Sequence, residues 1–126
     1  MVVLDTSALL YWTFAPEKLT VDAANAIETA YQVIISSISI WEIGLKVKNG
    51  KLEIPLSIEA FAARLKEADR VRIEPVTEVT WLKNLDLAWD HKDPADRTIV
   101  ATASLLACAL ITSDQEIRSF YANAVW

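Results

Sequence analysis

The sequence predicts an α/β fold with a mostly parallel sheet and helices on both of its faces. Short runs of consecutive apolar residues alternate along the chain with longer segments in which apolar residues recur at helical spacing. Strands that are covered on both faces are continuously apolar, and their alternation with helices is typical of strand–helix–strand units. With 126 residues, of which 53% are hydrophobic, the chain is predicted to form a single domain over residues 1–126.

Four segments are predicted to be strands. The first, second and fourth are apolar rather than alternating, which favours a parallel sheet buried on both faces. In chain order the four segments are Val2 to Leu4, Val33 to Ser36, Val71 to Val76, and Leu110 to Thr112.

Two helices are predicted in the middle of the chain. The first is opened by the segment Ser36-Ser37-Ile38-Ser39 and continues from Ile40 to Lys48. It ends at Asn49-Gly50, because both of these residues tolerate the left-handed conformation. Ser57 can cap the second, whose apolar stripe consists of Ile58, Phe61, Ala62 and Leu65.

A third helix is predicted to begin after Asp93. Asp93 can cap it, Pro94 suits the first turn, and Asp96 three residues later completes the pattern of a capping box. The helix is predicted to run to about Ala109. Its predicted buried stripe is Ile99, Ala103, Leu106 and Leu110.

Composition excludes several classes of protein. A single cysteine, Cys108, rules out an internal disulfide and a cysteine-based zinc site, so any metal must be held by oxygen. A net charge of −5 disfavours nucleic-acid binding through basic residues alone. The longest apolar run, 101–111, is too short to cross a membrane, and the N-terminus lacks the basic region of a secretory signal. We therefore expect a soluble, cytoplasmic protein that does not bind membranes.

Four acids are predicted to converge at one edge of the sheet. Asp5 directly follows the first predicted strand, and Asp114 follows the last by two residues. Glu42 lies about one turn into the helix after the second strand, and Asp96 lies in the first turn of its own helix. Because ligands bind at the carboxyl ends of parallel strands, we expect these carboxylates to share one site. Gathered like charges need a cation, and Mg²⁺ prefers oxygen ligands.

Each acid also has a structural explanation. Asp5 can end a strand and cap a helix, and Glu42 can be a solvated helix residue. Asp93 is more simply a helix cap than a ligand, Asp96 can complete the capping box, and Asp114 can be a turn residue. The joint hypothesis is favoured because the predicted positions of the acids coincide.

At these residues the sequence resembles a PIN domain, and specifically the VapC toxins of bacterial and archaeal toxin–antitoxin pairs. The resemblance covers essentially the whole chain. The segments that carry it are Val3-Leu4-Asp5-Thr6-Ser7-Ala8-Leu9-Leu10, Ser36-Ser37-Ile38-Ser39-Ile40-Trp41-Glu42-Ile43, His91-Lys92-Asp93-Pro94-Ala95-Asp96-Arg97, and Leu110-Ile111-Thr112-Ser113-Asp114.

The resemblance implies a PIN-like three-layer fold and an endoribonuclease that depends on Mg²⁺, for which Mn²⁺ can substitute. It also implies inhibition by a cognate antitoxin protein and frequent homodimerisation. The acids that match its catalytic metal-site positions are Asp5, Glu42, Asp96 and Asp114, and the supporting hydroxyl positions are Thr6, Ser7 and Thr112. A PIN-like module that has lost catalysis and only binds an antitoxin or RNA is the alternative.

Several further residues have two interpretations. Arg97 can contact substrate phosphate or hold a carboxylate, or can form a structural ion pair. Lys46, Lys48 and Lys51 can guide RNA or can simply be a solvated helix end. His91, the only histidine, has no serine or cysteine partner and is not expected to act directly.

The tryptophans are interpreted mainly as packing residues. Core or dimer-interface packing is the default for Trp12, Trp41, Trp81 and Trp89, with base stacking as the minor alternative. Trp126 is expected either to dock on the surface or to be loose.

Two other α/β classes fit poorly. A receiver-like domain would need an acid at the end of a central strand, where the chain has Ser36 and Ser37. A phosphatase with an aspartate nucleophile would typically carry a second aspartate two residues after Asp5, where the chain has Ser7.

Overall fold

Five parallel strands form the central sheet of the computed structural model, which describes residues 1–126. The central strand is β1 (Val2–Leu4), which pairs with β2 (Val33–Ser36) on one side and with β4 (Ala109–Ile111) on the other. The edges are β3 (Val71–Glu74) and β5 (Ala124–Val125), so the strand order is β3-β2-β1-β4-β5. The predicted parallel sheet is confirmed, although the two-residue β5 was not predicted from the sequence.

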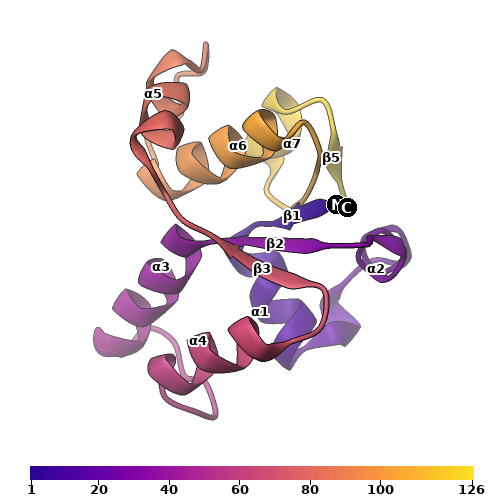
Figure 1. The fold of residues 1–126 in the computed structure, drawn as a ribbon, viewed down its shortest axis with the longest axis vertical. Helices are drawn as coiled ribbons and strands as arrows, with labels where there is room; N and C mark the ends of the chain where they lie inside the picture. The colour runs from indigo at the N-terminus through magenta and orange to yellow at the C-terminus, as the bar shows by residue number, and fades with distance from the viewer.

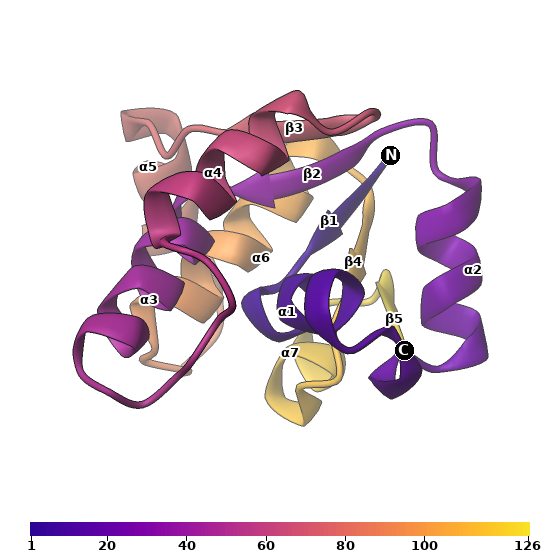
Figure 2. The ribbon, with the colours of Figure 1, turned by 90° about the horizontal axis from the view of Figure 1, so that it is seen from below.

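Helices cover both faces of the sheet and make three layers (Figure 1, Figure 2). The helices are α1 (Thr6–Phe14), α2 (Val21–Thr29), α3 (Ser37–Lys48), α4 (Ile58–Glu67), α5 (Glu78–Asp86), α6 (Pro94–Leu106) and α7 (Gln115–Phe120), with a short 3₁₀ helix at Pro16–Lys18. One core contains buried residues of α1, α2, α3 and α4, and the other contains buried residues of α6 and α7. No helix is long and apolar enough to span a bilayer.

The strands are apolar throughout because successive side chains enter the two different cores. In β1, Val2 and Leu4 belong to the core beneath α1, whereas Val3 belongs to the core beneath α6. In β2, Ile34 faces the α6 side, and its neighbours Val33 and Ile35 face the α1 side. This alternation is the physical origin of the continuous apolar runs in the sequence.

The predicted helices are present, with differences at their ends. Ser57 caps α4 by accepting a hydrogen bond from the backbone N–H of Ala60 at 3.1 Å, as expected. Helix α3 ends where predicted, and Gly50 adopts a left-handed φ of 71°. Helix α3 begins at Ser37, within the serine-rich segment predicted to open it, because the side chain of Ser36 caps it.

Helix α6 is shorter than predicted. It ends at Leu106 because Ala107 turns into the left-handed conformation, with φ 51° and ψ 45°. Ala109 therefore begins β4 instead of ending the helix, and Leu110 faces the core from a strand. The apolar run gave no sign of this turn, because it contains no glycine.

Strand β3 also stops short of the predicted Val76. Its last pair is Glu74 with Ser36, after which β2 turns into α3. Pro75 has no N–H for a sheet, and the N–H of Val76 donates instead to the Ser37 hydroxyl at 3.1 Å. Strand pairing thus ends where the neighbouring chain becomes helical.

Candidate functional site

An acidic cleft lies at the carboxyl edge of the sheet, where β1, β2 and β4 give way to helices. Its volume is about 240 Å³, and none of the residues that line it is hydrophobic. The structure places all four predicted metal-site acids on its wall. The lining residues are Asp5, Thr6, Ser7, Glu42, Lys46, Asp93, Asp96, Ser113 and Asp114.

Asp5 is the most deeply buried acid in the cleft, with 5% of its surface exposed. It follows β1 directly and caps α1, because its Oδ1 accepts the N–H of Ala8 at 2.7 Å. Its Oδ2 accepts a hydrogen bond from the Thr112 hydroxyl. The structural explanation considered for Asp5, a helix cap, is therefore correct and coexists with its position in the cleft.

The buried position of Asp5 changes its acidity. Burial raises the pKa of Asp5 from 3.8 to about 6, although the hydrogen bonds from Thr112 and Ala8 favour the ionised form. The negative charges of Asp96 and Asp114 raise this pKa further. The three acids therefore repel one another across the cleft when all are ionised.

Hydroxyl groups connect the acids to the framework. The Thr112 hydroxyl, which donates to Asp5, also accepts the N–H of Asp114 at 3.0 Å, so one side chain orders two of the acids. Thr6 is buried and donates to the Ser39 hydroxyl at 2.9 Å, which ties α1 to α3. Ser7 lies on the cleft wall.

Two further acids at the cleft cap helices, as Asp5 does. Asp114 caps α7 by accepting the N–H groups of Glu116 and Ile117 at 2.8 and 3.1 Å. Asp93 caps α6 by accepting the N–H of Asp96 at 3.0 Å, which confirms the helix-cap interpretation. The reciprocal bond of a capping box is absent, because the Asp96 carboxylate is turned towards a different partner.

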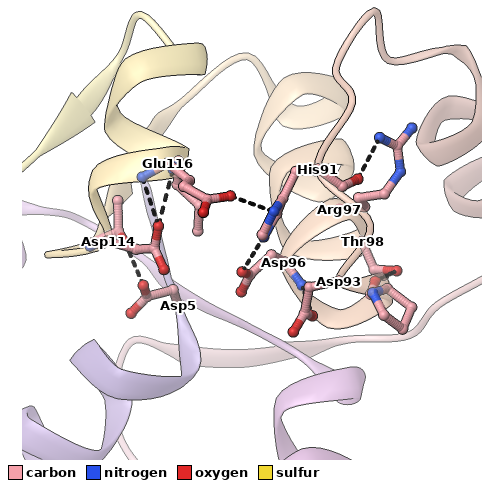
Figure 3. A network of polar contacts seen from close by, with 11 residues as sticks. Asp5, His91, Asp93, Asp96, Arg97, Thr98, Asp114 and Glu116 are labelled. Atoms are coloured by element: carbon pink, nitrogen blue, oxygen red, sulfur yellow. Dashed lines mark hydrogen bonds and ion pairs between the residues drawn. The ribbon is translucent and has the colours of Figure 1, made fainter.

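That partner is His91, for which the sequence predicted no direct role. Its Nε2 lies 2.8 Å from Asp96 Oδ2, and its Nδ1 lies 2.5 Å from Glu116 Oε2 (Figure 3). The hydrogen bond with Asp96 raises the pKa of His91, as do the nearby acidic charges. Burial raises the pKa of Asp96 in spite of the bond from His91. The only signal in the sequence was that His91 stands five residues before a candidate acid.

Arg97 binds backbone carbonyl oxygens rather than a carboxylate or an ion-pair partner. Its guanidinium forms no ion pair and does not line the cleft. It donates to the carbonyl oxygens of Asn84, Trp89 and His91 at 2.5, 2.5 and 3.0 Å, and to Asn84 Oδ1 at 3.2 Å. Arg97 therefore holds the loop that precedes α6 in place.

Lys46 is the only cationic side chain on the cleft wall. It lies one helical turn after Glu42 on α3, and no carboxylate is close enough to it for an ion pair. Lys48 and Lys51 do not line the cleft. The structure thus separates Lys46 from the other two lysines of the predicted cluster.

The tryptophans differ in their environments. Trp12 and Trp89 pack against the two cores, and Trp126 docks on the Tyr11 ring at a centroid distance of 6.1 Å. Trp41 and Trp81 are instead 58% and 46% exposed, so of the two predicted kinds of packing they do not have the core one, and packing at a dimer interface stays a prediction.

The cleft suits a hard cation, because all of its lining side chains except Lys46 offer carboxylate or hydroxyl oxygens as metal ligands. No three of the acids are close enough together to hold one ion by themselves. A cation held by fewer carboxylates must complete its coordination with water or substrate, as Mg²⁺ commonly does. The residues present therefore fit a hydrated Mg²⁺ ion better than an ion enclosed by protein.

Comparison with known proteins identifies the relatives of this chain. A family model described as PIN domain matches residues 2–123. The chain is 29% identical over 119 residues to Ribonuclease VapC22 of Mycobacterium tuberculosis, an alignment that covers 94% of this chain and 90% of that protein.

Solved structures share the fold. A toxin–antitoxin complex from Klebsiella pneumoniae matches with a TM-score of 0.69 and 21% identity, over 100% of this chain and 97% of that one. VapC20 of Mycobacterium tuberculosis, described as a Sarcin-Ricin loop cleaving toxin, matches with a TM-score of 0.67 and 17% identity, over 94% of each chain. The PIN-like three-layer arrangement predicted from the sequence is confirmed.

Replacing Asp5 by asparagine should stabilise the fold at neutral pH. Because the pKa of Asp5 is raised from 3.8 to about 6, its ionisation costs stability above pH 6 and nothing below about pH 4. A shift of this size corresponds to at most about 3 kcal/mol. We expect Asp5→Asn to raise the free energy of unfolding by about 1–3 kcal/mol at pH 7, measured by urea denaturation without divalent cations.

The matched control is Asp69→Asn, which changes an exposed acid in a turn. It should alter stability by less than about 0.5 kcal/mol. The interpretation fails if Asp5→Asn gains no more stability at pH 7 than at pH 4.

Proposed function

The chain belongs to the PIN-domain family, and on that premise we propose that it is a metal-dependent endoribonuclease, the toxin of a toxin–antitoxin pair. The observation that carries the proposal is the cleft whose wall carries Asp5, Glu42, Asp96 and Asp114. The name of its relative, Ribonuclease VapC22, and the toxin–antitoxin complex among the structural neighbours support the same activity.

The acids would hold Mg²⁺ or Mn²⁺, with Glu42 acting directly or through water. When bound, such an ion stabilises charge on the phosphate and makes water a stronger nucleophile at neutral pH. The buried hydrogen bonds of Asp5 fix one carboxylate rigidly, and Asp96 and Asp114 surround it from α6 and α7. The water oxygen attacks phosphorus and the bond to the 3′ oxygen breaks, which leaves 3′-hydroxyl and 5′-phosphate ends.

Lys46 would supply the positive charge that the acids lack. An RNA phosphate approaching a wall of carboxylates is repelled unless cations face it. The ammonium group of Lys46 is exposed and has no carboxylate partner, so it is free to contact a phosphate beside the metal ions.

We also propose two protein partners. The cognate antitoxin would be the inhibitor, by analogy with the Klebsiella pneumoniae complex.

A second copy of the chain would cover Trp41 and Trp81, which line an apolar hollow of about 370 Å³ between α3 and α5. Light scattering of the purified protein tests the homodimer, and a mass of 14.0 kDa at all concentrations would contradict it.

The proposed activity predicts that total cellular RNA is cut by the purified protein with Mg²⁺ or Mn²⁺ and is spared with EDTA. Asp5→Asn and Asp96→Asn should each lower the cleavage rate by at least about 100-fold, because each removes a charge that holds the metal. Mapping of the product ends should show 3′-hydroxyl and 5′-phosphate groups.

The control for lost negative charge is Glu28→Gln, which changes an exposed acid on α2 away from the cleft. It should cut at the parent rate. Lys46→Ala should raise KM for RNA more than Lys48→Ala does. Parent rates for both aspartate variants would refute the assigned site, and metal binding with intact RNA under every condition would favour the catalytically silent module.

A further inference from the structure

His91 connects two helices that lie on either side of the cleft. One ring nitrogen contacts the carboxylate of Asp96 on α6, and the other contacts the carboxylate of Glu116 on α7 (Figure 3). The His91 side chain is 18% exposed and lines a surface hollow of about 570 Å³ beside Trp89 and Glu116. Its two acidic partners leave it little freedom to rotate.

The backbone around His91 is also held in place by specific contacts. Residues 87–93 form neither helix nor strand, yet Arg97 binds the carbonyl oxygens of Trp89 and His91. The Trp89 ring lies 4.8 Å from the His91 ring and stacks on Phe120 of α7 at 4.7 Å and 9°. Arg97 and the stacked aromatic rings thus fix a loop that has no regular structure of its own.

These contacts of His91 determine how the Asp96 carboxylate is oriented. His91 engages Oδ2, and no protein group donates to Oδ1. Asp5 and Asp114 are oriented by backbone N–H groups, whereas the side chain of Asp96 has only His91 to orient it. A metal ligand is bound more tightly when a second group holds it in the binding orientation.

We propose that His91 is a positioning residue that orients the Asp96 carboxylate towards the cation of the cleft, with Glu116 and Arg97 holding His91 in turn. The inference rests on the proposed function only in taking the cleft as a cation site. It gives the segment from His91 to Arg97 a function in cation binding, beyond that of the four acids.

The test is to measure the affinity of the purified protein for Mn²⁺ by isothermal titration calorimetry, in the absence of RNA. His91→Ala should weaken Mn²⁺ binding about 10-fold or more, because the Asp96 carboxylate is then free to rotate. His91→Gln should recover part of the affinity, since its amide can still donate to Asp96. Glu116→Gln should have a smaller effect of the same sign.

The sign of the change separates positioning from simple electrostatics. Removal of a positively charged imidazolium would strengthen the binding of a cation, whereas loss of positioning weakens it. Lys92→Ala removes a neighbouring exposed cation from the same loop and serves as the matched control. It should leave the Mn²⁺ affinity unchanged or slightly higher.

Melting curves of the same variants identify a merely structural effect. If His91→Ala and Glu116→Gln lower the melting temperature but bind Mn²⁺ as tightly as the parent, the inference is wrong. It is also wrong if the parent protein binds no Mn²⁺. If the parent binds Mn²⁺ in a His91-dependent way but cuts no RNA, the nuclease proposal fails while the positioning inference stands.

Discussion

The buried carboxylate of Asp5 is the constraint around which the site is organised. It lies at the end of the central strand and caps α1. It also accepts a hydrogen bond from the hydroxyl of Thr112, the residue that follows β4. These contacts fix its position but do not neutralise its charge, which Asp96 and Asp114 oppose. The fold therefore holds negative charges together at a cost in stability, which a bound cation would offset.

Parallel topology explains why distant segments can build this site. Strands β1, β2 and β4 end at the same edge, and each is followed by a polar residue and a helix that carries or faces an acid. The fourth acid comes from the start of α6, which packs on the opposite face from α1. The cleft thus joins the two layers of helices across the edge of the sheet.

The parts of this arrangement that follow from local pattern were predictable from the sequence. The strand ends and helix caps place Asp5, Asp96 and Asp114 without any long-range information. The orientation of His91 was not predictable, because it depends on Glu116 and Phe120, which are distant in the chain. The contacts of Arg97 were not predictable for a similar reason, because its partners are mostly backbone carbonyl oxygens, which leave no mark in a sequence.

The measurement that tests this account most directly is the melting temperature at pH 7 as Mg²⁺ is added, compared with NaCl at equal ionic strength. Binding to the folded state alone stabilises it by about 2.7 kcal/mol at 100 times the dissociation constant. We expect a rise of several degrees with Mg²⁺ that NaCl does not reproduce and that Asp5→Asn greatly reduces. An equal response to both salts, or an undiminished response in Asp5→Asn, would contradict the claim that these acids form a cation site.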